Sequence, residues 1–194
     1  MTDFPLDPTT AARADADRAV VVLVGSLRRD SVNRRLARLA AASAPAGTAV
    51  DVVDDLDRLP FYNEDLDADG ERGDAVEELR ARVGAADAVL VVTPEYNGGL
   101  PAVLKNAIDW LSRPYGAGAF TGLPVGVIGA ASSAHAGTWA RQDARKAIGI
   151  AGGVVVEPVE LGIRSGEFDE ASPEIVGELG RLVAHLLPEP AAVG

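Results

Sequence analysis

The sequence contains no cysteine and only two histidines, His135 and His185. Without cysteine the chain has no disulfides, thiol nucleophiles, iron–sulfur clusters or thiolate metal sites. Two histidines are too few for a histidine-rich metal site, and no EF-hand spacing is present. These absences exclude most metal and thiol chemistry.

Long apolar runs and positive charge are also scarce. No segment approaches the ~20 apolar residues that span a bilayer, and the first 18 residues are polar and acidic, without an apolar signal core. The net charge is −11 at pH 7, which argues against nucleic acid or an anionic membrane as the main partner. The sequence therefore predicts a cytoplasmic protein that binds neither.

What the sequence does contain is a regular alternation of short apolar runs and helical patterns. The apolar runs are typical of buried parallel strands and cover 19–25, 48–54, 87–93, 123–130 and 153–161. The helical patterns cover 31–44, 72–84, 101–112 and 138–150, and a last one begins at Pro173. This alternation predicts a doubly wound α/β fold, with a parallel sheet covered by helices on both faces.

Two of the five expected strands have weaker burial patterns. The run 48–54 is mixed in polarity, and 153–161 contains Pro158, which cannot donate to a ladder. Both suit sheet edges, which predicts the strand order 2-1-3-4-5, with ligands beyond the carboxyl ends of strands 1, 3 and 4. We expect one domain over 19–187, a flexible N-terminal extension over 1–18 and a C-terminal tail over 188–194.

The first apolar run ends in the loop "GSLRRDSVN" (25–33), which precedes a helix. The free N–H groups and partial positive charge of a helix N-terminus favour an anion. Small residues at the start of the loop let a phosphate approach the backbone, Ser31 and Asn33 can donate to it, and Arg28 can bind two of its oxygens. The alternative is a capped helix with solvent-facing arginines, as we expect for Arg34, Arg35 and Arg38.

Other nucleotide-binding signatures are missing from the chain. GxxxxGK[ST] is absent, which excludes a P-loop NTPase, and GxGxxG does not follow the first strand, which argues against a dinucleotide site. Thr93 stands where a receiver domain requires an acid. The first loop is therefore interpreted on its own residues.

The loops after strands 3 and 4 complete the predicted crevice. "TPEYNGGLPAVLKNAIDWLSRP" (93–114) offers backbone groups, a tyrosine and an open glycine pair, which suit the edge of a flat heterocycle. The alternative is a strand-to-helix turn with an aromatic plug. "GAASSAHAGTWARQ" (129–142) is rich in small and hydroxyl residues and could line the other side, with His135 more typical of a surface loop than of a catalyst.

These three segments together resemble the NAD(P)H-dependent FMN reductases of flavodoxin-like fold, a family that includes quinone, azo-dye and chromate reductases. The resemblance rests on "GSLRRDSVNRRLA", "TPEYNGGLPAVLKNAIDWLSRP" and "GAASSAHAGT" and covers about 19–187. It implies that FMN binds to Ser26, Arg28, Ser31, Val32, Asn33, Pro94, Glu95, Tyr96, Asn97, Gly98, Ser132 and Ser133. The phosphate would be held by Ser26, Arg28, Ser31 and Asn33. The flavin ring and ribityl chain would contact Pro94, Glu95, Tyr96 and Asn97, and the other flavin edge would contact Ser132 and Ser133. The third loop departs from the family by lacking its glycine pair or Pro-Gly.

The resemblance also implies an activity and an assembly. NADPH or NADH would pass a hydride to N5 of FMN, and the electrons would then go to a quinone, azo compound, metal oxyanion or flavin in a ping-pong sequence. A homodimer or homotetramer would form through the "LKNAIDWLSRP" helix, with Trp110 and Arg113 exposed to the partner. Arg113 and Arg141 are candidates for contacts with the nicotinamide phosphate.

Two other functions remain open at this point. A flavodoxin-like electron carrier would bind FMN without oxidising NAD(P)H, but its phosphate loop normally lacks arginine, so Arg28 argues against it. A flavin-free regulatory or binding module is the third possibility.

Overall fold

The structure, a computed structural model, describes residues 16–68 and 70–187. Its strands are β1 (Arg18–Val24), β2 (Thr48–Val53), β3 (Ala88–Val92), β4 (Pro124–Ala131) and β5 (Val154–Arg164). Its α-helices are α2 (Val32–Ala42), α3 (Asp74–Gly84), α4 (Ala102–Leu111), α5 (Thr138–Ile150) and α6 (Pro173–Leu186). Short 3-10 helices occupy Leu56–Arg58 (η1), Glu64–Leu66 (η2) and Ser165–Glu167 (η3). The expected terminal extension and tail lie, apart from residues 16–18, outside the described residues.

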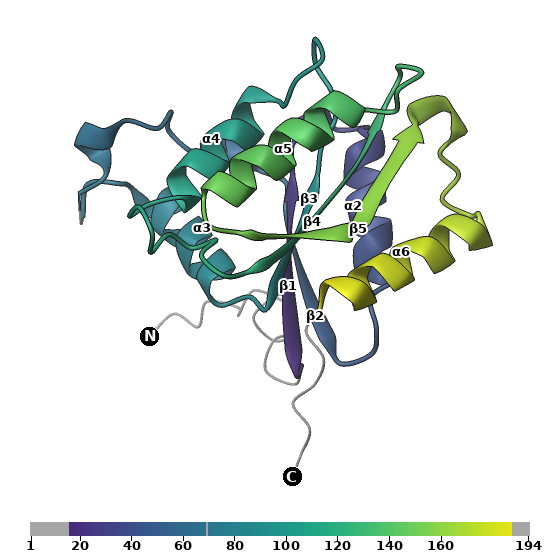
Figure 1. Cartoon of the computed structure of the whole chain (residues 1–194), viewed down its shortest axis with the longest axis horizontal. Coiled ribbons are helices and arrows are strands. Elements are labelled where there is room, and N and C mark those ends of the chain that lie inside the picture. The colour runs from purple at the N-terminus through teal and green to yellow at the C-terminus, as the bar shows by residue number, and fades with distance from the viewer. Residues whose placement is uncertain (1–15, 69, 188–194) are drawn as a thin grey trace, which may run out of the picture.

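The five strands form one parallel sheet in the order β2-β1-β3-β4-β5 (Figure 1). The predicted α/β fold and strand order are therefore confirmed. The order follows from burial: β1 and β3 are apolar along their length and lie in the interior, whereas β2 and β5 carry polar residues and lie at the edges.

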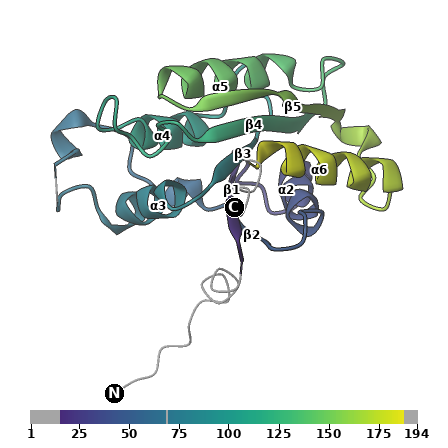
Figure 2. The same cartoon turned by 60° about the horizontal axis from the view of Figure 1, so that its bottom comes forward.

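Helices cover both faces of the sheet and build two cores. Alternate residues of β1 point in opposite directions, so that Val21 and Leu23 pack against α3, α4 and α5. Val20, Val22 and Val24 pack against α2 and α6. Figure 2 shows α4 and α5 on one side of the strands and α2 and α6 on the other. None of the helices in the described ranges has the length and apolar character needed to cross a bilayer.

The edge strand β5 continues past its proline. Its pairing with β4 changes register, since Val125 pairs with Val155 but Val127 pairs with Glu160. Pro158 lies within this irregularity, so its missing N–H removes no ladder hydrogen bond. The strand then runs on to Arg164, three residues beyond the predicted end.

The fold places the three predicted loops side by side. The backbone N–H of Gly25, just after β1, donates to Val92 of β3 over 2.9 Å. The N–H of Thr93, just after β3, donates to Ile128 of β4 over 3.0 Å. The carboxyl ends of β1, β3 and β4 therefore open onto one edge, as expected for a ligand crevice in this topology.

Candidate functional site

Two buried hydroxyls stand where β1 passes into α2. Ser26 and Ser31 are 2% and 4% exposed. Ser31 is the N-cap of α2, and its Oγ accepts from the backbone N–H of Asn33 over 3.1 Å. Since the Ser31 oxygen is the acceptor there, its own proton stays available for another oxygen. The hydroxyls and the positive end of α2 together form a donor-rich seat for an anion.

Arg34 is largely buried beside these hydroxyls, so the expectation that it faces solvent is wrong. Its Nε donates to the carbonyl of Ser26 over 3.2 Å. Its Nη2 donates to the carbonyl of Asp54 over 2.6 Å, and Nη1 pairs with the Asp54 carboxylate at 3.0 Å. The Ser26 carbonyl is thus tied to a cation, which keeps its negative end from opposing a bound anion. Sequence periodicity missed this role because Asp54 comes from another strand.

The other arginines around the loop differ in their pairing. Arg35 pairs with Glu170 at 2.6 Å, and Arg38 approaches Asp54 at 3.6 Å, both on the exposed face that the sequence predicts. Arg28 is exposed and forms no hydrogen bond or ion pair with any residue of 16–68 or 70–187. Its guanidinium is therefore exposed to solvent and not engaged by the fold.

The side-chain amide of Asn33 is already hydrogen-bonded within the fold, unlike the phosphate donor that the sequence predicts. Asn33 is 3% exposed, its Nδ2 donates to the carbonyl of Ala130 and its Oδ1 accepts from the Ala130 N–H, both over 2.8 Å. This pair of hydrogen bonds ties the start of α2 to the end of β4. Val32, half-buried, begins the helix beside it.

The loop after β3 forms a tight turn. Tyr96 and Gly99 exchange two backbone hydrogen bonds, and the two residues between them have positive φ angles, 52° for Asn97 and 73° for Gly98. This is the pattern of a type I′ turn, for which Asn-Gly is the preferred pair. The turn leaves Tyr96 half-exposed at 49%, and a Cβ on Gly98 would lie 3.5 Å from the ring of Trp139. Pro94, buried, precedes the turn.

Glu95 joins this turn to α5. The N-cap residue of α5 is Gly137, which has no side chain to cap the helix. The Glu95 carboxylate accepts instead from the N–H groups of Trp139 and Ala140 at 3.0 and 3.2 Å, and from Ser133 Oγ at 3.4 Å. Sequence reasoning missed this cap because the carboxylate lies 44 residues before Trp139.

The loop after β4 bends sharply. Ala136 and Gly137 both have positive φ angles, 49° and 76°. Ser132 is exposed and Ser133 is half-buried. His135 is also exposed, with its ring centroid 4.8 Å from that of Trp139.

These three loops fit FMN better than a metal or a covalent substrate. The buried hydroxyls at the start of α2 and the unpaired Arg28 suit a phosphate, and the open turn opposite the serine loop suits the edge of a planar ring. In the part of the chain that the structure describes, no three metal-ligating side chains gather at one point.

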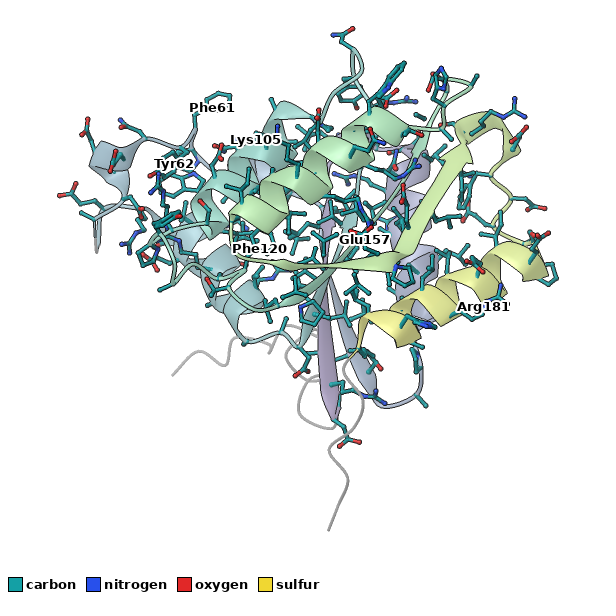
Figure 3. All side chains as sticks on the ribbon, in the orientation of Figure 1. Phe61, Tyr62, Lys105, Phe120, Glu157 and Arg181 are labelled. Carbon is teal, nitrogen blue, oxygen red and sulfur yellow. The ribbon has the colours of Figure 1, made fainter. Side chains whose placement is uncertain are left out.

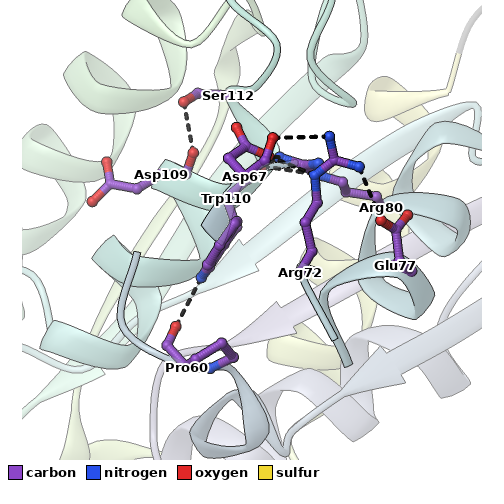
Figure 4. Close-up of polar contacts among 8 residues, drawn as sticks. All are labelled: Pro60, Asp67, Arg72, Glu77, Arg80, Asp109, Trp110 and Ser112. Atoms are coloured by element: carbon purple, nitrogen blue, oxygen red, sulfur yellow. Dashed lines mark hydrogen bonds and ion pairs between the residues drawn. The ribbon is translucent and has the colours of Figure 1, made fainter. Parts of the chain in front are cut away.

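Two sequence expectations about α4 and α5 are wrong. Trp110 is fully buried, and its Nε1 donates to the carbonyl of Pro60 over 2.8 Å, so it is not exposed to a partner (Figure 4). The segment between β2 and α3 covers Trp110 on α4, and the ring of Tyr62 from this segment packs edge-on against it at 4.9 Å. Arg141 is 6% exposed, which removes it from contacts with a nicotinamide phosphate. Arg113, half-buried, lies over the ring of Tyr62.

Comparison with known proteins agrees with this geometry. The family model described as "NADPH-dependent FMN reductase" matches residues 19–167. A 2-hydroxy-1,4-benzoquinone reductase from a Burkholderia species is 38% identical over 160 residues, which cover 82% of this chain and 86% of that protein. A quinone reductase from Pseudomonas putida is 42% identical over 130 residues, which cover 67% and 69%.

A solved structure extends the likeness to three dimensions. FerB, a flavoenzyme NAD(P)H:(acceptor) oxidoreductase from Paracoccus denitrificans, aligns with a TM-score of 0.76 and 32% identity, covering 87% of this chain and 97% of that one. The family model spans all three loops of the crevice, from β1 to beyond β4. The chain therefore belongs to the NADPH-dependent FMN reductase family, and it is an oxidoreductase that uses FMN and NAD(P)H.

Proposed function

We propose that this reductase oxidises NADPH or NADH and reduces a small-molecule acceptor in a ping-pong sequence, with quinones as the first acceptor class. FMN, when bound, supplies hydride acceptance from the nicotinamide and electron donation to the acceptor. The names of the quinone reductases above support the acceptor class. The convergence of three loops on buried hydroxyls at the start of α2 is the observation that carries the proposal.

The protein's first task is to hold the phosphate of FMN. Ser26 and Ser31 donate their hydroxyl protons, and the first N–H groups of α2 add the positive end of the helix. Arg28 closes over the anion with a charge-assisted bond. Asn33 and Arg34 keep the seat in shape through Ala130 and Asp54.

Its second task is to hold the ring. The backbone of Pro94–Gly98 lines one side of the ring in our proposal, and Ser132 and Ser133 line the other. Backbone N–H groups of this loop would stabilise negative charge on the cofactor when it is reduced. No side-chain acid or base is required, which fits a crevice without a catalytic triad.

Steady-state kinetics test the proposal. The purified protein, loaded with FMN, is mixed with NADPH or NADH and with benzoquinone, an azo dye, chromate or free flavin. We expect the quinone to be reduced fastest and double-reciprocal plots at several quinone concentrations to be parallel. Intersecting lines would contradict the ping-pong order, and NADPH oxidation no faster with quinone than without it would contradict the acceptor class.

We also propose that the chain forms a homodimer or homotetramer through α4 and α5. A groove of about 870 Å³ lies between these helices. Tyr115 and Ile150 line it and are 85% and 70% exposed, and a partner copy would cover these two large side chains. Light scattering of the protein and of Ile150→Glu tests this: we expect the variant to be smaller, and equal masses would contradict it. The cytoplasmic location stays a prediction from the sequence.

A further inference from the structure

Arg141 is a buried cation on a helix that otherwise turns small and apolar residues inward. The side chain is 7% exposed, and its buried companions on α5 are Ala140, Ala144 and Ile148. A charged group in such a place needs partners, because an unpaired buried charge is strongly destabilising. The identity of those partners indicates what the charge does.

The guanidinium joins three parts of the molecule. Nη1 donates to the carbonyl of Ala136. Nε and Nη2 each lie 3.3 Å from Oε1 of Glu160 on β5. The group rests directly on Gly162, where a Cβ would stand 2.2 Å from Nη1. The loop after β4 is thus fastened to the edge strand through one side chain.

The loop needs such fastening because its backbone is in a disfavoured conformation. Ala136 has a φ of 49°, a left-handed value that residues other than Gly, Asn and Asp rarely adopt. Strained residues of this kind persist where the surroundings hold them, and they cluster at functional sites. The bond from Arg141 reaches the carbonyl of this very residue.

The opposite end of the loop is fastened independently. Glu95, from the loop after β3, accepts from Ser133 Oγ and from the first N–H groups of α5. Gly137 lies between the two fastenings, since a Cβ there would stand 3.8 Å from Arg141 Nη1 and 3.8 Å from Glu95 Cβ. Residues 131–137 are therefore held from both sides, by the Glu95 carboxylate and by the Arg141 guanidinium.

We propose that Arg141 is a positioning residue for the flavin: it holds residues 131–137 in the conformation that presents Ser132 and Ser133 to the cofactor. The proposal rests on the proposed function, in which this loop lines the flavin ring. Arg141 acts through the loop and does not itself touch the cofactor, in keeping with its burial.

The same helix provides a matched control. Arg145, one turn further along α5, also reaches β5, where it pairs with the carboxylate of Glu157. Figure 3 shows Glu157 on the part of β5 that passes beneath α5. The Arg145 side chain is 11% exposed, close to the 7% of Arg141. The pair joins the same two elements, but Arg145 forms its hydrogen bonds with Glu157 and none with residues 131–137.

The test compares Arg141→Met with Arg145→Met. We measure the FMN dissociation constant, the flavin midpoint potential, the visible circular dichroism of bound FMN and chemical unfolding. Because the lost hydrogen bond holds the loop and not the cofactor, we expect Arg141→Met to weaken FMN binding by about tenfold, the cost of ordering a released loop on binding, and to change the flavin dichroism and potential. Arg145→Met should lower stability to a similar degree but leave all three flavin signals unchanged.

Two further variants keep the test decisive if Arg141→Met folds poorly. Arg141→Lys retains a donor for the Ala136 carbonyl and should recover part of the affinity. Gly162→Ala leaves every charge in place but pushes the guanidinium off β5, and it should reproduce the flavin changes of Arg141→Met. Equal flavin properties in the Arg141 and Arg145 variants would overturn the proposal.

Failure of the positioning role can be told apart from failure of the proposed site. If Arg28→Ala weakens FMN binding while Arg141→Met and Gly162→Ala do not, the phosphate seat stands and the role of Arg141 is wrong. If none of these variants affects FMN binding, the cofactor lies elsewhere and the proposed site itself is wrong.

Discussion

Arg80 in α3 and Arg72 just before it are paired within the fold, whereas Arg28 in the loop after β1 is not. Arg80 donates through Nε and Nη2 to the carbonyl of Trp110 at the end of α4, and Nη2 also binds Asp67 at 2.9 Å. Arg72 binds the same Asp67 oxygen at 2.6 Å (Figure 4). Arg28 has no such partner anywhere in 16–68 or 70–187. One region uses its cations to hold the chain together, and the other keeps a cation free.

The difference follows from where the acids lie. Acidic residues crowd 51–78, so an arginine nearby meets a carboxylate at short range. The Asp51 carboxylate, for example, accepts hydrogen bonds from Arg82 and raises the pKa of Arg82 against the opposing effect of burial. Beside the loop after β1, Asp54 pairs with Arg34, and none of the described acids pairs with Arg28. Arg28 and Arg29 are both exposed and unpaired in the described residues, so the lack of a partner does not by itself separate them, and the variants below compare the two.

The paired region should lose most when an arginine is removed. Arg80→Met leaves the orphan carbonyl of Trp110 uncapped and Asp67 with one cation fewer, and we expect a loss of about 2–4 kcal/mol in unfolding free energy. Urea unfolding measures the loss, and FMN titration should show nearly unchanged affinity. A variant as stable as the parent protein would mean that the cluster does not hold the β2–α3 segment on α4.

The unpaired region should respond in the opposite way. Arg28→Ala should weaken FMN binding by about 1.5–3 kcal/mol, the scale of a charge-assisted hydrogen bond to an anion, with unfolding changed by less than about 0.5 kcal/mol. Fluorescence titration of FMN measures the affinity. Arg29→Ala, exposed on the same loop, is the control and should bind FMN normally. Equal affinities for the two variants would remove Arg28 from the site.

Low pH should lower the stability of the paired region by a smaller amount than removal of Arg80, through protonation of Asp67. Burial alone would raise the pKa of Asp67, but hydrogen bonds from Arg72 and Arg80 outweigh it and hold the pKa below the ordinary 3.8. A lowered carboxylate pKa stabilises the fold above the unfolded value, and this contribution is lost as the pH falls through the folded value.

Unfolding measured at pH 6 and at about pH 3 tests this pKa shift. We expect the parent protein to lose about 1 kcal/mol more stability over this interval than Asp67→Asn. Asp57→Asn, exposed on the same segment, should behave as the parent does. A parent and an Asp67→Asn protein with the same acid loss would show that Asp67 is not held ionised by its arginines.

Much of the fold could be predicted from local patterns. Continuous apolar runs marked β1 and β3 as interior strands, and Pro158 marked β5 as an edge, because these properties depend on one strand and its exposure. The Asn97–Gly98 turn also has a local signal, since Asn-Gly favours type I′ angles, but the interpretation of Gly98 and Gly99 as an open glycine pair missed it. The three loops followed from strand order, since parallel strands in this order end at the same edge of the sheet.

Long-range partners could not be predicted in this way. Arg34 and Arg28 are alike in sequence context, yet one binds Asp54 and the other does not. Trp110 belongs to an amphipathic helix, but only the β2–α3 segment folding over it decides that it is buried. Glu95 and Arg141 likewise take their roles from groups on other elements.

The sequence alone determined the alternation of strands and helices, the edge strands and the composition of the three loops at the carboxyl ends of β1, β3 and β4, because hydrophobic periodicity and turn chemistry act over a few residues. The tertiary structure decided which charged side chains pair within the fold and which stay exposed to solvent. Side chains separated by tens of residues pair only after the chain has brought them within about 4 Å, and at that range a carboxylate or a carbonyl outcompetes water for an arginine.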